Sequence, residues 1–175
     1  MNCAIPLEDS PSDTDAAETL ARVQQILTTV TDPEIPTLSV VEMGIVSRIQ
    51  LIGSAVVIDM TPTFAGCPAL DVIRRNISAA LKAGGFQFVN VNVVFDPPWS
   101  SDQITEEGRR KLKAFGLAPP KQACSEITEL QIAAVSCPFC DSENTTLESI
   151  FGPTLCRAIH YCNACRQSFE QFKPI

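Results

Sequence analysis

Apolar residues recur at helical spacing in two segments of the chain. Residues 15–30 place five apolar side chains on a single face: Leu20, Val23, Ile26, Leu27 and Val30. This spacing is typical of an amphipathic helix. We expect the helix to stop before Pro33, because a residue that precedes proline disfavours the α conformation. Residues 69–85 repeat the pattern and end in Gly84 and Gly85, which predicts a second helix with a glycine C-cap.

The apolar runs between and after these segments have the pattern of strands. Residues 44–52 and 55–62 are separated by two turn-forming residues, which indicates a β-hairpin. Residues 88–95 alternate apolar and polar positions, as a half-buried strand does. A charged third helix is predicted over residues 104–116, with Thr105 as its N-cap.

Pattern and composition divide the chain into four parts. We predict an acidic, mobile tail at residues 1–15, an α/β domain at 16–118, a linker at 119–135 and a cysteine-rich module at 136–175. The expected fold class is α/β: a small mixed-sheet domain in the order α-β-β-α-β-α, followed by a C-terminal β module of the zinc-ribbon kind.

The formal net charge of −7 is concentrated near the N-terminus, where five acidic residues precede Arg22, the first basic one. The rest of the chain is close to neutral, so we expect no nucleic-acid partner. The N-terminus has no signal-peptide pattern, and no apolar run reaches the roughly 20 residues of a membrane span. We therefore expect a cytoplasmic protein without a membrane partner, whose cysteines are reduced, metal-bound or reactive.

Four cysteines near the C-terminus form two C-x2-C pairs. Cys137 and Cys140 are separated from Cys162 and Cys165 by twenty-one residues. Each pair can present two thiolates to one ion, and four thiolates close the coordination sphere, so we predict one structural zinc site. About forty residues bury little core, so the metal is expected to supply much of the folding free energy. Iron is the alternative, because rubredoxin-type sites use similar pairs.

Cys67 lies between a predicted strand and a predicted helix. Pro68 suits the first helical position, which would place the thiol near free N–H groups and lower its pKa. A second loop carries Asp32 and Glu34. If the two loops meet, the thiolate, the carboxylates and nearby hydroxyls could hold a metal transiently. The alternative is that Cys67 only caps a helix and the carboxylates only shape a turn.

His160 is the only histidine of the chain and lies in the other module, so no base for a cysteine enzyme is evident. It shares a strand face with Cys162 and could replace or support a ligand, although a packed or surface histidine is the favoured interpretation. We expect Cys156 to be a buried small hydrophobe rather than a fifth ligand. We assign no function to Cys3 or Cys124.

Two sets of motifs resemble known families. The stretches "VTDPEIPTLSVVEMGIV" and "TPTFAGCPAL" resemble the small domain family of iron-sulfur assembly factors. The stretch "PPWSSDQITEEGRRKLKAFGLAPP" and the cysteine-rich C-terminus resemble the family of phenylacetate-degradation D proteins, which belong to a multicomponent phenylacetyl-CoA ring epoxidase. That family tends to have Pro-Ala-Trp where this chain has Pro97-Pro98-Trp99, a departure expected to be neutral.

The resemblance implies a non-catalytic accessory subunit that assists iron-sulfur or iron cofactor assembly in a partner subunit, above all the flavin/iron-sulfur reductase. Cys67 would be the reactive thiol, with Asp32, Glu34, Thr61 and Thr63 around it and a transient iron ion or cluster as cargo. The chain has neither the Glu-x-x-His motif of a di-iron bundle nor a Rossmann fingerprint, so the epoxidation chemistry is expected on other chains. The alternative is a structural adaptor that docks through its zinc ribbon.

Overall fold

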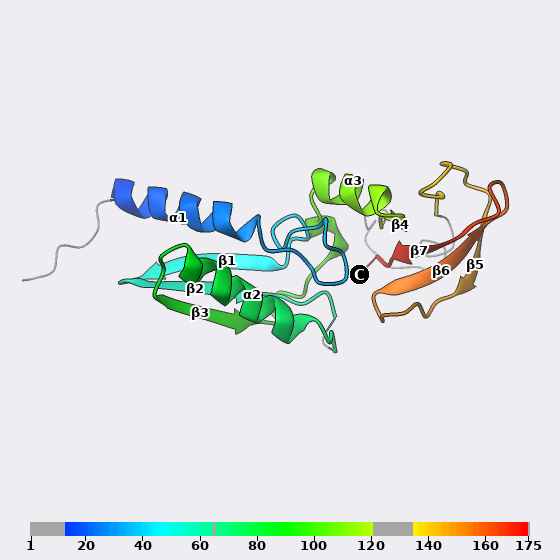
Figure 1. Cartoon of the computed structure of the whole chain (residues 1–175). Helices are drawn as coiled ribbons and strands as arrows, with labels where there is room; N and C mark the ends of the chain where they lie inside the picture. Colours follow the sequence, from blue (N-terminus) through cyan, green and yellow to red (C-terminus); the bar gives the residue numbers. More distant parts are fainter. Residues whose placement is uncertain (1–12, 65, 121–134, 175) are drawn as a thin grey trace, which may run out of the picture.

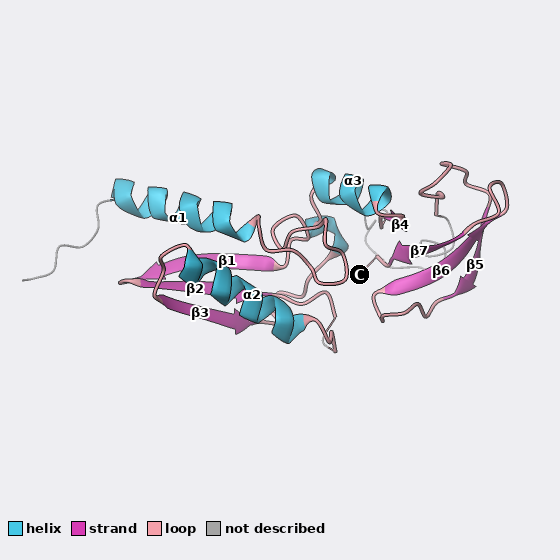
Figure 2. Ribbon diagram, viewed as in Figure 1, coloured by secondary structure: helices cyan, strands magenta, loops and turns pink. Residues whose placement is uncertain are grey.

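The computed structural model describes residues 13–64, 66–120 and 135–174 (Figure 1). Its strands form two sheets (Figure 2). The elements are α1 (Asp13–Leu27), β1 (Val46–Ile52), β2 (Ala55–Met60), α2 (Leu70–Ala83), β3 (Phe88–Val93), a 3-10 helix (Ser101–Gln103), α3 (Glu106–Ala114), β4 (Leu117–Ala118), β5 (Thr145–Ser149), β6 (Arg157–Cys162) and β7 (Ser168–Phe172).

The first sheet has the order β1-β2-β3 and confirms the predicted mixed α/β fold. Strands β1 and β2 form the predicted antiparallel hairpin, and its turn uses Gly53 at a φ of 58°, a conformation that suits glycine. Strand β3 runs parallel to β2, and α2 supplies the crossover connection that parallel strands need. Along β2 every second residue is buried, because α1 and α2 pack against this sheet.

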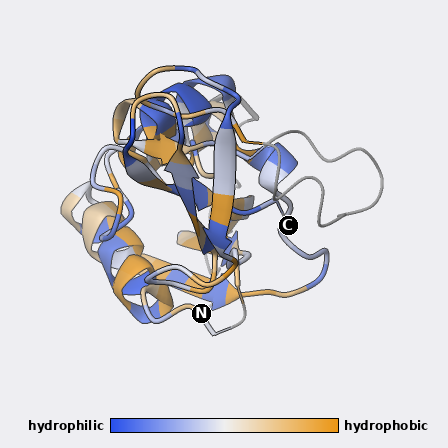
Figure 3. Ribbon diagram, turned by 90° about the vertical axis from the view of Figure 1, so that its right-hand side faces the viewer, coloured by the Kyte–Doolittle hydropathy of each residue, from blue (hydrophilic) through white to orange (hydrophobic). Residues whose placement is uncertain are grey.

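The two long helices bury the faces that the sequence predicts. On α1, Val23 and Leu27 are fully buried, and on α2 the buried residues are Ile73, Ile77 and Leu81. Figure 3 shows hydrophobic and hydrophilic positions together on the helices, as amphipathic helices require. No helix in the described part of the chain combines the length and apolar character needed to cross a membrane.

Helix α1 ends at Leu27, earlier than the apolar pattern predicted. The hydroxyls of Thr28 and Thr29 donate hydrogen bonds to the carbonyls of Gln25 and Ile26, each at 2.7 Å. Such side-chain bonds compete with the helical backbone pattern. Val30 is still buried, with 5% of its surface exposed, but from the turn that follows the helix.

The caps of α2 and α3 agree with the sequence. Gly84 is the C-cap of α2, and a Cβ at this position would lie 2.4 Å from Cδ1 of Ile26, so a larger residue would force the Ile26 side chain to shift. The Thr105 hydroxyl accepts a hydrogen bond from the Gly108 backbone N–H at 3.0 Å, which confirms the N-cap of α3.

The second sheet has the order β4-β7-β6-β5. Strands β5, β6 and β7 pair antiparallel, whereas β4 pairs parallel with β7 through Glu170 and Gln171. Strand β4 ends the segment predicted as the first domain, so both parts of the chain contribute to this sheet. Most of the predicted tail and linker lies outside the described residues, and so do Cys3 and Cys124. The tail was predicted to extend to residue 15, whereas residues 13–15 form the start of α1.

Side chains of both parts meet in one core. Trp99 has 4% of its surface exposed, and its Nε1–H donates a hydrogen bond to the Met43 carbonyl at 3.1 Å. Its ring lies 5.9 Å from that of Phe172, at the end of β7. Trp99 therefore serves packing, and this packing joins the two parts of the chain.

The loop before β1 is fastened to α3 through Glu42. Its carboxylate accepts hydrogen bonds from Lys111 Nζ at 2.6 Å and from the Ser39 backbone and hydroxyl at 2.9 Å. Burial alone would raise the pKa of Glu42, but the bonds from Lys111 and Ser39 outweigh it and hold the pKa below its ordinary value. The folded state therefore favours the ionised carboxylate.

Replacing Glu42 by glutamine should lower the free energy of unfolding by about 1.5 kcal/mol at pH 7. The lowered pKa means that the unfolded chain takes up the proton first as the pH falls. The difference in the free energy of unfolding between the wild type and Glu42→Gln is therefore complete above about pH 5 and decreases below about pH 4.3. Urea unfolding of both chains at pH 7 and pH 4 measures this. Glu107→Gln is the control, since its ion pair with Arg110 is exposed, and an equal loss there would contradict the account.

Candidate metal and thiol sites

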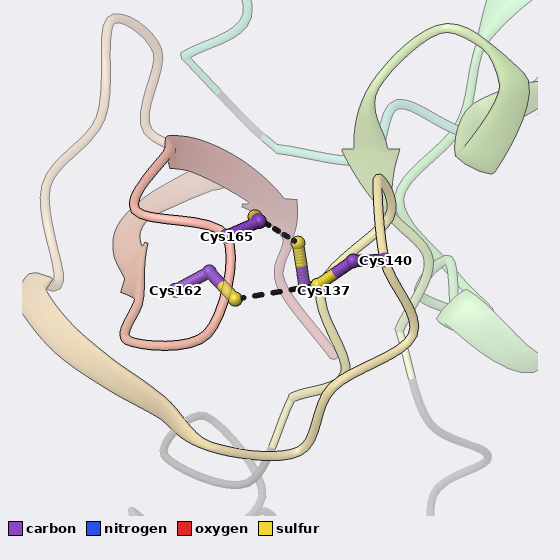
Figure 4. Close-up of side chains that lie close together, drawn as sticks. All are labelled: Cys137, Cys140, Cys162 and Cys165. Carbon is purple, nitrogen blue, oxygen red and sulfur yellow. Dashed lines mark hydrogen bonds between the residues drawn. The ribbon is translucent and has the colours of Figure 1, made fainter.

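The four cysteines of the two C-x2-C pairs point toward one another from two turns beside the second sheet (Figure 4). Their sulfur atoms all lie within 4.8 Å of one another. The sulfurs of Cys137 and Cys165 are 3.7 Å apart, and those of Cys140 and Cys162 are 3.5 Å apart. A tetrahedral zinc ion with bonds of about 2.3 Å separates its sulfur ligands by about 3.8 Å. The four side chains therefore fit a single tetrahedral ion.

The two cysteine turns are built alike. The N–H of Asp141 donates to the Cys137 carbonyl at 3.0 Å, and the N–H of Arg166 donates to the Cys162 carbonyl at 2.8 Å. Each donor is the residue directly after the second cysteine of its pair, and each has a positive φ, 60° for Asp141 and 61° for Arg166. This repeated geometry folds each C-x2-C segment so that both of its thiols face the same point.

The pKa values of two of these thiols are shifted in opposite directions. Hydrogen bonds from the backbone N–H groups of Cys165 and Ala164 lower the pKa of Cys162 to about 6. Burial raises the pKa of Cys165 to about 12. A metal would displace these protons, because thiolates are the binding form. A bound ion would be closed off by four sulfurs, with no position left for a substrate.

His160 lies outside this cluster. It is fully buried, stacks on Phe169 with ring centroids 5.4 Å apart, and its Nε2 lies 3.0 Å from Oε1 of Gln171. Within the described residues, the group of three or more potential ligands close enough to share one ion consists of the four cysteines. The interpretation of His160 as a packed histidine is confirmed.

Cys67 precedes α2 rather than beginning it. The Leu70 N–H donates to the Cys67 carbonyl at 3.3 Å, which closes a turn before the helix, and α2 starts at Leu70 with Ala69 as its cap. The placement of Pro68 at the first helical position was therefore wrong. The turn hydrogen bond keeps Cys67 and Pro68 outside the helix.

The expected lowering of the Cys67 pKa was also wrong. Burial raises the pKa of the thiol, and this outweighs the hydrogen bond from the Ala69 backbone N–H, which lowers it. Negative charge on Cys156, Asp32 and Glu34 raises the pKa of Cys67 further. The folded environment of Cys67 therefore favours the thiol over the thiolate.

Cys67 lines a cavity of about 220 Å³ between the first part of the chain and the ribbon. The loop before α2 contributes Thr63 and Cys67, the loop after α1 contributes Glu34, and the facing wall is Gly152–Cys156. A second cavity of about 20 Å³ connects Cys67 with Thr63 and Asp32. The structure therefore places three of the other four predicted residues, Asp32, Glu34 and Thr63, in cavities that Cys67 also lines.

Asp32, Glu34 and Thr61 differ in their hydrogen-bond and ion-pair partners. Oδ1 of Asp32 accepts hydrogen bonds from the N–H groups of Glu34 and Ile35 at 2.7 and 3.0 Å, so Asp32 shapes its own turn. The Glu34 carboxylate lies 3.4 Å from the guanidinium of Arg157. Thr61 is buried, and its hydroxyl has no hydrogen-bond partner within the described residues.

The sequence predicted Cys156 to be a buried small hydrophobe, but the residue is only partly buried, and its position beside Cys67 was not predicted. It lines the cavity together with Cys67, and its sulfur lies 3.2 Å from the Thr154 hydroxyl. Spacing offered no signal, since 88 residues separate the two cysteines. The ion pair between Glu34 and Arg157, which holds the two walls together, was missed for the same reason.

Comparison with known proteins separates the chain into the same two parts. Residues 20–93 match the family model described as iron-sulfur cluster assembly protein, and residues 121–173 match the PaaD zinc beta ribbon domain. A crystal structure of a DUF59 domain from Bacillus anthracis superimposes with a TM-score of 0.54 at 26% identity, over 58% of this chain and 97% of that domain. Fold and cysteine cluster thus define an iron-sulfur assembly domain joined to a zinc ribbon.

Two curated proteins extend this comparison. An Escherichia coli (strain K12) protein, named as the D component of a "Putative 1,2-phenylacetyl-CoA epoxidase", is 38% identical over 86% of this chain and 90% of its own length. A Porphyromonas gingivalis protein named "Fe-S protein maturation auxiliary factor" is 30% identical over 51% of this chain and 87% of its own length. The chain belongs to the family of D components of 1,2-phenylacetyl-CoA epoxidases.

Proposed function

We propose that this chain is a non-catalytic accessory subunit that helps an iron or iron-sulfur cofactor reach a partner subunit of a phenylacetyl-CoA epoxidase. The observation that carries the proposal is the position of Cys67: a partly buried thiol that lines a cavity, on the domain whose relatives are named for iron-sulfur maturation. Thiolates bind iron and iron-sulfur clusters. The expected client is the subunit that carries the flavin and iron-sulfur centres, and the expected compartment is the cytoplasm.

In this proposal the ribbon holds zinc through Cys137, Cys140, Cys162 and Cys165. Its role is structural, because four sulfurs leave no open position. The ion would fix the position of β6 and β7, and through them the wall that faces Cys67. Glu34 and Thr63 would line the path of the cargo, whereas Asp32 supports the turn that carries Glu34.

A structural adaptor is the second candidate, and a specific surface favours it. Phe115 and Phe139 are 44% and 53% exposed and line a hollow of about 350 Å³ beside the second sheet. Exposed aromatic side chains are enriched where proteins bind one another. This surface could hold a partner subunit without any contribution from Cys67.

Co-expression with the reductase subunit separates the two candidates. With Cys67→Ser we expect the iron content of the purified reductase to fall to the level found without this chain. Cys124→Ser is the matched control, as it removes one thiol to which no function is assigned. Unchanged reductase iron with Cys67→Ser, at equal amounts of soluble protein and zinc, would favour the adaptor.

A further inference from the structure

Two cysteines from distant parts of the chain share the walls of one cavity. Cys67 comes from the loop between β2 and α2, and Cys156 comes from the residue before β6. Neither belongs to the four-cysteine cluster. The cavity measures about 220 Å³, whereas a water molecule takes up about 30 Å³ of liquid volume. An ion with several ligands of its own therefore fits between the two walls.

The wall that carries Cys156 is fixed against the first part of the chain. The adjacent Arg157 lies 2.8 Å from Glu170 and 3.4 Å from Glu34, which itself lines the cavity. The Lys173 N–H donates to the Cys156 carbonyl at 2.9 Å. These contacts order the backbone at Cys156 before any ligand arrives, so binding would not have to pay for that ordering.

We propose that Cys67 and Cys156 together bind a thiophilic divalent metal ion in the cavity between the two parts of the chain. This inference deepens the proposed function and rests on it, because it identifies the second sulfur ligand of the cargo. Binding releases one proton from each thiol and forms two metal–sulfur bonds, so the ion and two thiols give a neutral dithiolate complex and two protons.

The ligand set is suited to a transient ion. Within the described residues, no third thiol, imidazole or carboxylate completes a cluster around these two sulfurs. The nearby Glu34 carboxylate is held by Arg157. A two-sulfur site leaves positions of the ion open to water or to a client's cysteines, whereas the closed four-sulfur set suits a resident ion. Burial is the main cause that raises the pKa of Cys67, and negative charge on Cys156 raises it further, so a bound divalent ion would offset the repulsion between the two thiolates.

Cobalt(II) titration tests this site, because cobalt–thiolate bonds give charge-transfer absorption. The full zinc-loaded chain carries Cys3→Ser and Cys124→Ser, so that the free thiols are those of Cys67 and Cys156. We expect one cobalt ion to bind with this absorption while the zinc is retained. Cys67→Ser and Cys156→Ser should each weaken cobalt binding at least about tenfold, and the combined change should add little.

Two results would overturn the inference: no cobalt–thiolate absorption in the parent chain, or wild-type cobalt affinity in Cys156→Ser. Zinc content shows in each case that the ribbon is folded. The outcomes are distinct from those of the proposed function. If cobalt binding requires both cysteines but reductase iron is independent of Cys67, the site stands and the function fails. If reductase iron depends on Cys67 but cobalt binding ignores Cys156, the function stands and the two-sulfur site fails.

Discussion

Replacing Cys162 by serine should abolish metal binding and unfold the ribbon. Within the described residues, the separate core of the ribbon consists of five buried residues, and two of them are cluster cysteines: Ala118, Val135, Cys137, Cys162 and Phe169. So small a core cannot offset the conformational entropy of the segment. Structural zinc contributes about 10–16 kcal/mol in isolated zinc fingers, so losing a buried ligand removes the main source of stability.

The measurement is zinc content per chain together with the near-ultraviolet circular dichroism of the purified protein. Cys156→Ser is the matched control, because it removes a thiol of the same module that is not part of the cluster. The control should keep one zinc ion and wild-type structure. A Cys162→Ser chain that keeps both its metal and a folded ribbon would contradict the structural role of the cluster.

Replacing Trp99 by alanine should lower the free energy of unfolding by about 3–5 kcal/mol. The change empties a large buried site, removes the contact with Phe172 and leaves the Met43 carbonyl without the indole hydrogen bond. Because Phe172 belongs to β7, the loss should also loosen the ribbon. Trp99 is the only tryptophan, so unfolding is followed by circular dichroism rather than by fluorescence.

Leu81→Ala serves as the control for Trp99→Ala. Leu81 is fully buried in the same core but lies on α2, away from the ribbon. Its replacement should cost about 2–5 kcal/mol without making the zinc more accessible to a chelator. Faster zinc removal in Trp99→Ala alone would show that the aromatic pair couples the two parts. Equal chelation rates in both variants would contradict that coupling.

The predictions that succeeded rest on local signals. Helical spacing identified the buried faces of α1 and α2, and two turn residues identified the β1–β2 hairpin. The C-x2-C spacing likewise identified the four cysteines that gather in Figure 4. In each case the residues that interact lie within a few positions of one another, or are brought together by a motif with a known geometry.

The features that the sequence did not reveal depend on distant contacts. Whether Cys67 is activated depends on its burial and on the charges of Asp32, Glu34 and Cys156, and these raise the pKa that local helix geometry was expected to lower. The pairing of β4 with β7 likewise depends on residues that are distant in the sequence, since it joins Leu117–Ala118 to residues about fifty positions later. The hydrophobic periodicity within one segment cannot predict contacts between segments that are distant in the sequence.

If Cys67 takes part in supplying a cofactor to a partner, the rate of cluster reconstitution in that partner should depend on the Cys67 thiol. Purified apo-reductase is given iron(III), sulfide and a thiol with a substoichiometric amount of this chain, and cluster formation is followed by visible absorption. We expect faster formation with the wild type, more than one client loaded per chain, and no acceleration by Cys67→Ser. Equal acceleration by the wild type and by zinc-loaded Cys67→Ser would contradict this role of Cys67.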